Sequence, residues 1–139
     1  MKIPTHLLFV YGALSDAEMR SNLFAAVVPA APATLKNYRL RSHEGFLFAS
    51  PYDGSSIEGL IISLTSEQLR IADAWEDVPV YTRTKVLVTC SHRRIEACTY
   101  ARPGIKGTRA TSSEICSFSK EEVLLMIQDF RLKMFGGKK

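Results

Sequence analysis

The stretch LLFVYGAL occupies residues 7–14 and is followed by SDAE at residues 15–18. The continuous apolar run before the tyrosine is typical of a strand that is buried on both faces. Ser15, with Glu18 three residues later, forms the capping-box pattern that begins a helix, so we expect Ser15 to be the N-cap. The sequence therefore predicts a strand, a turn at Gly12 and a helix.

Two interpretations of the Gly12 turn are open. Backbone amides beside a turn and at a helix start can bind an anion or a carbonyl oxygen, and a glycine lets that backbone lie close to a ligand. The same residues also suit a turn that only joins a strand to a helix. The spacings GxxxxGK[ST] and GxGxxG, which mark loops that bind nucleotide phosphates, are both absent.

Glu76 is the acid of most interest in the second half of the chain. A second capping box, TSEQ at residues 65–68, predicts a helix that runs to about Glu76. Leu69, Ala72 and Glu76 fall on one helical stripe, which places the acid on the apolar face. Burial would raise its pKa toward neutrality, as a general acid or base requires. A solvated acid at the helix end is the alternative.

Other polar residues near this helix have less specific patterns. Tyr81 and Tyr100 are expected on strands, where each hydroxyl is either satisfied within the core or offered to a ligand. Asp73 and Asp77 fall on other faces of the helix than Glu76, and we expect them to be ordinary surface charges.

The rest of the sequence predicts further short strands and two further helix boundaries. We expect a first helix to about residue 27, strands at 34–41, 45–50, 57–63, 81–90 and 95–101, turns at 51–54 and 91–94, and an exposed loop at 103–113. A third capping box begins a helix at Ser119, with the apolar stripe Val123, Ile127, Phe130 and Met134. Because strands and helices do not alternate strictly, the sequence predicts a single α+β domain over residues 1–139, with a curved or barrel-like sheet and a frayed tail at 136–139.

The composition narrows the class of protein. A chain of 139 residues with 46% hydrophobic residues is typical of one globular domain. The three cysteines contain no CxxC pair and the three histidines have no ligand spacing, so we expect no metal and the reduced thiols of a cytoplasmic protein. The net charge of +4 comes from scattered basic residues, which disfavours nucleic-acid binding. No run approaches the roughly 20 apolar residues of a membrane span.

Five pieces of the chain, taken in order, resemble the gamma-glutamylcyclotransferase-like superfamily, in particular its gamma-glutamylamine cyclotransferase and avirulence-induced-gene-like branch. The pieces are LLFVYGAL at 7–14, ATLKNYRL at 33–40, IEGLI at 57–61, LRIADAWE at 69–76 with YTR at 81–83, and ACTY at 97–100. Several residues depart from the family pattern, among them Trp75 and Asp77, which stand on either side of Glu76 where phenylalanine and glycine are common. Ala13 stands where threonine or serine is usual, and Asn37 stands where glycine is usual.

The resemblance implies a small mixed β-barrel with flanking helices. It also implies an enzyme that needs no cofactor and releases 5-oxoproline from a small gamma-glutamyl amine or gamma-glutamyl peptide, with Glu76 as the catalytic acid/base. The residues that it assigns to substrate binding are Tyr11, Gly12, Ala13, Leu14, Tyr81 and Tyr100. The missing hydroxyl at Ala13 leaves a second interpretation open, a non-catalytic member of the same fold that binds a small anionic metabolite. The sequence specifies neither the leaving amine nor the oligomeric state.

Overall fold

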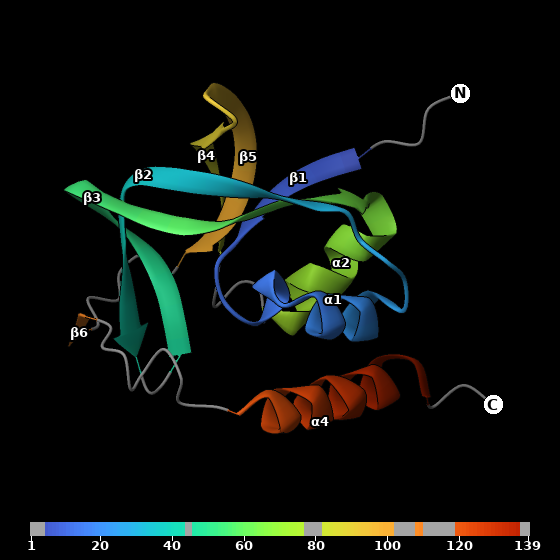
Figure 1. The fold of residues 1–139 in the computed structure, drawn as a ribbon. Coiled ribbons are helices and arrows are strands. Elements are labelled where there is room, and N and C mark those ends of the chain that lie inside the picture. Colours follow the sequence, from blue (N-terminus) through green and yellow to red (C-terminus); the bar gives the residue numbers. More distant parts are fainter. Residues whose placement is uncertain (1–4, 44–45, 77–81, 102–107, 110–118, 137–139) are drawn as a thin grey trace.

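The computed structural model describes residues 5–43, 46–76, 82–101, 108–109 and 119–136 (Figure 1). Its strands are β1 (Thr5–Val10), β2 (Ala30–His43), β3 (Phe46–Thr65), β4 (Thr82–Cys90), β5 (Arg93–Ala101) and β6 (Thr108–Arg109). Its helical elements are the 3-10 turn η1 (Ala13–Ser15), α1 (Ala17–Phe24), α2 (Ser66–Trp75), α4 (Lys120–Arg131) and the π-helical turn η2 (Leu132–Gly136). The α+β fold class expected from the sequence is confirmed.

The pairings of β1 to β5 trace a ring. Strand β3 pairs antiparallel with β1 along its last part and with β2 along most of its length. Strands β4 and β5 form an antiparallel hairpin. Single bridges join β1 to β5 through Leu8 and Cys98, and β2 to β4 through Thr34 and Thr89. These pairings curve the mixed sheet on itself, so that it has an inner and an outer face.

A hydrophobic core fills each face of the sheet. The inner core draws side chains from all of β1 to β5, namely Phe9, Ala33, Leu35, Ala49, Ile57, Ile61, Val86, Val88 and Ala97. The outer core lies between the sheet and the helices and contains Leu8, Val10, Leu14, Met19, Leu23, Phe24, Val28, Ile62, Leu64, Leu69, Ile71, Ala72, Tyr100 and Ile127. Because successive strand residues point to opposite faces, β1 is buried on both sides, as its apolar run predicts.

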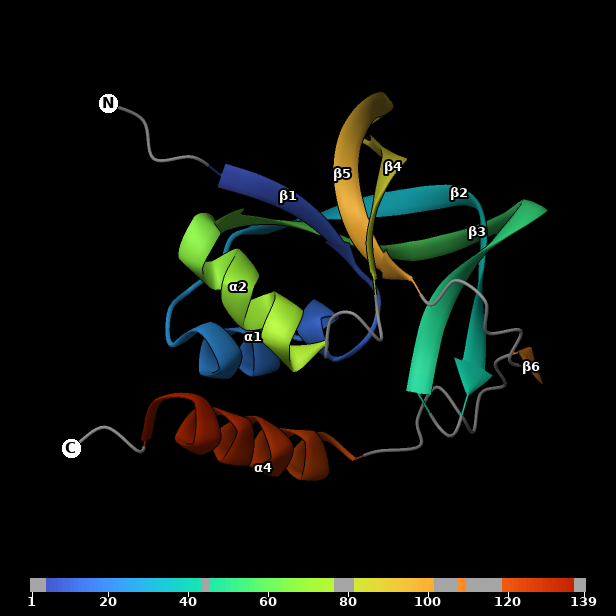
Figure 2. The same ribbon diagram turned by 180° about the vertical axis from the view of Figure 1, so that it is seen from behind.

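The helices lie together on one side of the sheet. Helices α1 and α2 lie next to β1, and α4 lies beyond them, as Figure 1 and the reverse view in Figure 2 show. The rings of Trp75 in α2 and Phe130 in α4 meet edge to face, with centroids 5.5 Å apart. Within the described part of the chain, no helix is long and apolar enough to cross a membrane.

Two of the three helix starts agree with the sequence. The side chains of Thr65 and Ser119 each accept a hydrogen bond from the backbone N–H three residues later. Their own backbone N–H groups donate to the side chains of Gln68 and Glu122, so both capping boxes are confirmed. The predicted stripe of α4 is also confirmed, because Ile127 is buried and Val123, Phe130 and Met134 pack against the same core.

The turn expected at residues 51–54 is wrong. Strand β3 continues through it as the partner of β2, and the register between the two strands shifts near Asn37. Asn37 has φ 67° and Gly54 has φ 89°, and the Gly54 N–H donates to Asn37 Oδ1 at 3.2 Å. Two long strands can bend together where such residues accept a left-handed backbone. The asparagine at the usual glycine position therefore keeps the required backbone conformation.

The last strands form as expected where the structure describes them. Ser91 and His92 both have positive φ, which gives a two-residue turn between β4 and β5, shorter than the four residues expected. Most of the loop expected at 103–113 lies outside the described residues, as does the end of the tail. The short strand β6 within that loop pairs with β2.

Candidate active site

The end of β1 is tied to two other strands through the side chain of Tyr11. Its hydroxyl donates to the backbone carbonyl of Tyr100 in β5 at 2.9 Å and accepts from the backbone N–H of Ala49 in β3 at 3.0 Å. Both bonds use backbone groups, so the Tyr11 hydroxyl supports the fold of the turn that follows it. A ligand-binding role for this residue would therefore involve its ring or its backbone.

Gly12 lies at an exposed bend between β1 and η1. The N–H and the hydroxyl of Ser15 both contact the Gly12 carbonyl, which closes the turn. A Cβ built at Gly12 meets no described heavy atom within 4 Å, and its φ is not in the left-handed region. The described part of the fold therefore has room for a side chain here. Glycine is required at this position only if something else approaches the backbone.

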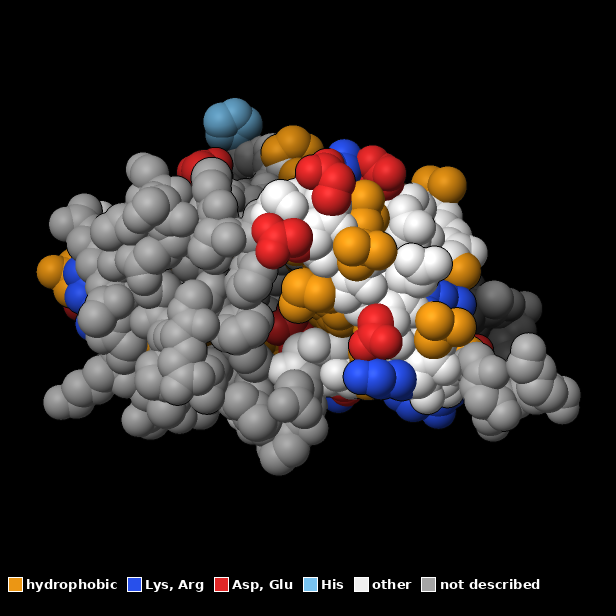
Figure 3. Space-filling view, turned by 90° about the horizontal axis from the view of Figure 1, so that it is seen from below, with side chains coloured by type: hydrophobic (Ala, Val, Ile, Leu, Met, Phe, Trp, Pro, Cys, Tyr) orange, Lys and Arg blue, Asp and Glu red, His pale blue; other side chains and the backbone are white. Residues whose placement is uncertain are grey.

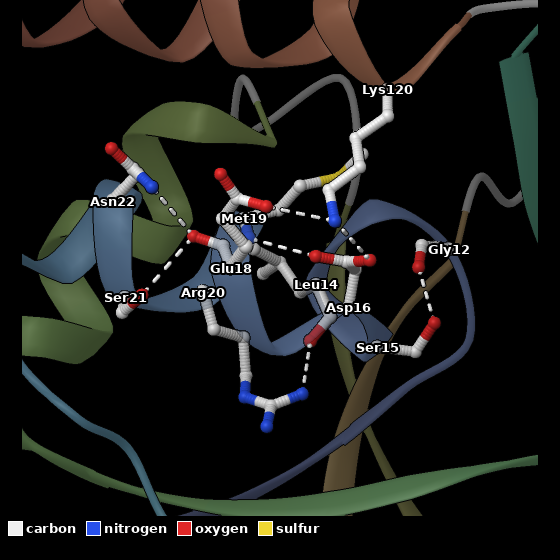
Figure 4. A network of polar contacts seen from close by, with 10 residues as sticks. All are labelled: Gly12, Leu14, Ser15, Asp16, Glu18, Met19, Arg20, Ser21, Asn22 and Lys120. Carbon is white, nitrogen blue, oxygen red and sulfur yellow. Dashed lines mark hydrogen bonds and ion pairs between the residues drawn. The ribbon is translucent and has the colours of Figure 1, made fainter.

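The expectation that Ser15 caps the first helix is wrong, and Figure 4 shows why. Because the Ser15 hydroxyl contacts Gly12, the cap falls to Asp16, whose Oδ1 accepts from the Met19 N–H at 3.0 Å. That hydrogen bond lowers the pKa of Asp16. Helix α1 then ends at Phe24 with Ala25 in a left-handed conformation, earlier than expected. A carboxylate thus already occupies the start of α1, and an anion would have to use the backbone of residues 12–14 instead.

Two cations lie close to this turn. Lys120 at the start of α4 reaches Glu18 Oε1 at 2.8 Å and Asp16 Oδ2 at 3.5 Å (Figure 4). Arg20 is buried in α1 and donates from Nη1 to the Leu14 carbonyl at 3.1 Å, while its Nε has no hydrogen-bond partner among the described residues. Arg20 therefore holds the end of the turn and places a positive charge behind it. No pattern in the sequence predicts this role, because an arginine in a polar helix is usually solvated.

Glu76 is the C-cap of α2, where its backbone N–H continues the helical bonding to Ala72. The residue keeps part of its surface exposed, yet its carboxyl group lies deep among protein atoms. Burial raises the pKa of Glu76 from 4.5 to about 7. Among the described residues no hydrogen bond or ion pair opposes that rise. Such a carboxyl can both take up and release a proton near neutral pH.

A second acid of α2 takes part in a polar cluster next to Glu76. Asp73 Oδ1 accepts from the Tyr100 hydroxyl at 2.6 Å and from Arg83 Nε at 2.8 Å. The expectation that Asp73 is an ordinary surface charge is therefore wrong. Burial, the bond to Asp73 and the negative charges of Asp73 and Glu76 together raise the pKa of Tyr100 well above its usual range. Tyr100 is thus a neutral phenol within range of the charge on Glu76.

The structure brings some of the residues expected in the site together and leaves others undescribed. Tyr11 joins the Gly12 turn to the strand that carries Tyr100, and Tyr100 lies within range of the charge on Glu76. Leu14 is buried in the outer core and its side chain has no polar group, so any polar contact with a ligand would come from its backbone. Tyr81 and Asp77 lie outside the described residues, and the side chain of Ala13 is not described.

A groove of about 800 Å³ lies elsewhere, between α1 and α4. Its walls include Glu18, Asn22, Leu125 and Arg131, and none of the residues expected to bind substrate. Figure 3 shows hydrophobic side chains beside acidic and basic ones on the underside of the molecule, where α4 lies. Size alone does not make it the reactive site, because the two acids that line it, Glu18 and Glu121, are exposed. Among the described residues, no group of three or more side chains could hold a metal ion.

Comparisons with known proteins agree with this architecture. The solution structure of a protein from Arabidopsis thaliana matches with a TM-score of 0.68 at 19% identity, over 99% of this chain and 90% of that one. A structure described as gamma-glutamyl cyclotransferase matches with a TM-score of 0.66 at 17% identity, over 92% and 87%. The crystal structure of an AIG2-like protein from Mus musculus matches with a TM-score of 0.57 at 20% identity, over 79% and 90%. At these identities the likeness shows the fold alone.

A search of curated protein sequences found no match. The family model described as gamma-glutamyl cyclotransferase, AIG2-like matches residues 8–119, which include the Gly12 turn, Glu76 and Tyr100. The match covers most of the chain and confirms the resemblance inferred from the sequence. The chain therefore belongs to the gamma-glutamyl cyclotransferase, AIG2-like family.

Proposed function

We propose that the protein is a cyclotransferase that releases 5-oxoproline from a gamma-glutamyl amine or gamma-glutamyl peptide. The observation that carries the proposal is the buried carboxyl of Glu76, whose pKa of about 7 suits a general acid/base. Family membership supports this reaction class. The neutral phenol of Tyr100 does not compete for that role, because its pKa lies well above its usual range.

The chemistry requires little beyond folding the substrate and moving one proton. The α-amino nitrogen of the substrate attacks its own γ-carbonyl carbon and closes a five-membered lactam. Glu76 as carboxylate accepts a proton from that nitrogen and then delivers it to the departing amine as the old C–N bond breaks. Backbone amides of residues 12–14 would hold the carbonyl oxygen as it gains negative charge. Because both reacting groups belong to one molecule, positioning supplies much of the rate.

The test is 5-oxoproline release from a panel of gamma-glutamyl amines and gamma-glutamyl amino acids. We expect wild type to form product and Glu76→Gln to lose activity while keeping its melting transition. Glu67→Gln is the matched control, because Glu67 is an exposed acid in the first turn of the same helix. Equal activity of the Glu76→Gln and Glu67→Gln variants would contradict the proposed role of Glu76.

A second candidate is a non-catalytic protein that binds a small anionic metabolite. One observation favours it: Ala13 offers no hydroxyl at the turn. It predicts that gamma-glutamyl compounds raise the melting temperature of wild type and of Glu76→Gln alike, without product. Turnover by wild type would exclude it.

We also propose that the protein acts in the cytoplasm on free small molecules, without a cofactor and without nucleic acid. Free thiols at Cys90 and Cys98 suit a reducing compartment. Cell fractionation tests the location. Titration with RNA at low salt tests the exclusion of nucleic acid, because charge-driven binding is strongest there.

A further inference from the structure

The cluster of Asp73, Arg83 and Tyr100 is not used by the acid/base step. Its members come from α2, β4 and β5, so the cluster joins α2, which Glu76 caps, to the β4–β5 hairpin (Figure 2). Arg83 and Tyr100 lie opposite each other in the β4–β5 register. A single oxygen, Asp73 Oδ1, receives both side chains, at 2.8 Å from Arg83 Nε and at 2.6 Å from the Tyr100 hydroxyl.

This geometry fixes the direction of the Tyr100 proton. An arginine Nε–H can only donate, and its permanent positive charge favours the carboxylate form of the partner. A carboxylate oxygen only accepts, so the tyrosine must donate to Asp73 as well. The distance of 2.6 Å is typical of a hydroxyl bound to a charged oxygen. The phenol oxygen of Tyr100 therefore has no proton left for a ligand and can only accept.

We propose that Asp73 is a positioning residue that holds Tyr100 as a hydrogen-bond acceptor, so that Tyr100 and Glu76 together recognise the N–H groups of a free α-amine on the substrate. The inference rests on the proposed function and deepens it by naming the residues that hold the attacking amine. The accepted ligands are gamma-glutamyl compounds with an unmodified α-amino group. Compounds that lack this amine, or carry an acyl group on it, leave the acceptors unpaired and bind weakly.

The net charge of the polar groups around Tyr100 also favours an amine ligand. Asp73 and Arg83 neutralise each other, and the Glu76 carboxylate adds one negative charge close to the Tyr100 hydroxyl. A protonated amine would balance that charge and donate to both oxygens. The tie from Tyr11 to the Tyr100 carbonyl keeps this strand against the Gly12 turn, where the other end of a gamma-glutamyl group would lie.

The experiment compares a gamma-glutamyl alkylamine with its des-amino analogue, the matching N-alkyl glutaramide, which cannot cyclise. The KM of the first and the inhibition constant of the second are measured for wild type, Tyr100→Phe, Asp73→Asn and Asp73→Glu. Tyr52→Phe is the matched control, because Tyr52 is an exposed tyrosine of β3. Thermal denaturation checks that each variant is folded.

We expect Tyr100→Phe and Asp73→Asn to raise the KM of the amine substrate by about tenfold, the effect of losing one hydrogen bond to a charged group. The inhibition constant of the des-amino analogue should stay within about twofold, because that analogue makes no bond to these oxygens. Asp73→Glu should restore part of the loss, since it keeps the charge and the acceptor. A variant that weakens both compounds equally would overturn the proposal, because the residue would then act on the structure alone.

The outcomes separate this inference from the proposed function. If wild type makes 5-oxoproline and Tyr100→Phe leaves the preference for the amine unchanged, the inference fails and the proposed function stands. If wild type makes no product, calorimetric titration replaces the kinetic constants. If wild type then binds the amine compound more tightly than the des-amino analogue, and Tyr100→Phe removes this difference, the recognition of the amine is supported and the proposed cyclotransferase activity is overturned. Binding of neither compound overturns both.

Discussion

The Tyr11 hydroxyl donates to the backbone carbonyl of Tyr100 at 2.9 Å, across 89 residues of chain. This bond, with the one that Tyr11 accepts from Ala49, ties the end of β1 to β5 and β3 just before the Gly12 turn. The two halves of the candidate site are therefore positioned by a hydroxyl that itself need not touch substrate.

Tyr11→Phe should destabilise the protein by about 1–3 kcal/mol, because it leaves a partly buried carbonyl and N–H without their partner. The measurement is urea denaturation at neutral pH. Tyr52→Phe, at an exposed position, should change the free energy of unfolding much less. A Tyr11→Phe variant as stable as wild type would show that these backbone groups find other partners.

The two glycines at positions 12 and 59 should respond in opposite ways to alanine. A Cβ at Gly59 would lie against the Val10 carbonyl oxygen and the Phe9 ring, so Gly59→Ala should cost roughly 3 kcal/mol. The new Cβ of Gly12→Ala meets no atom of the described residues, so this variant should leave the melting temperature nearly unchanged. If the Gly12 backbone contacts substrate, the same variant should lose activity. Full activity of Gly12→Ala would remove the turn from the site.

Most substitutions of Asn37 should destabilise the protein. Its φ of 67° disfavours most side chains, and its Oδ1 accepts from the Gly54 N–H. Asn37→Ala should therefore cost about 1 kcal/mol, and Asn37→Gly should cost less because glycine accepts this backbone freely. Thermal melts of the two variants compare the costs, and a more stable alanine variant would contradict the role of the backbone conformation.

Glu76 should make the stability of the protein depend on pH. Its pKa is about 7 in the folded state and near 4.5 when unfolded, so the folded state binds more protons between these values. Stability should therefore fall as the pH rises from 4.5 through 7, by at most roughly 3 kcal/mol.

The Glu76→Gln variant tests this dependence by chemical denaturation across the pH range. It should be more stable than wild type above pH 7 and close to wild type below pH 4.5, because glutamine carries no charge to bury. A constant difference between the two proteins at every pH would mean that the pKa of Glu76 is not raised.

The features that the sequence predicted correctly depend on residues close together in the chain. The capping boxes at Thr65 and Ser119 need only residues three apart, and the burial of β1 on both faces follows from its unbroken apolar run. The first cap lies at Asp16, one residue later than its pattern predicts, because the Ser15 hydroxyl contacts Gly12 instead, and the neighbouring residues do not reveal this contact. The turn expected at residues 51–54 is wrong because β3 continues there as the partner of β2, and a local pattern of turn residues does not reveal a partner strand.

The polar cluster beside Glu76 could not be predicted because its bonds join distant residues. Asp73 meets Arg83 ten residues away and Tyr100 27 residues away, and these meetings depend on where α2 packs against the hairpin. The helical stripe assigns Asp73 to another face than Glu76, although residues three apart are neighbours on a helix surface, and it gives Asp73 no partner. One signal was present: Asp73 lies within the stretch LRIADAWE, which carries the family resemblance.

The most direct test of the central claim is the rate of 5-oxoproline release as a function of pH, for wild type and Glu76→Gln with the best substrate of the panel. If the Glu76 carboxylate is the base, kcat/KM of wild type should rise with pH and level off above about 7, and Glu76→Gln should be inactive throughout. A wild-type profile that is flat across this range, or a Glu76→Gln variant that retains the activity and the pH profile, would contradict the role of Glu76.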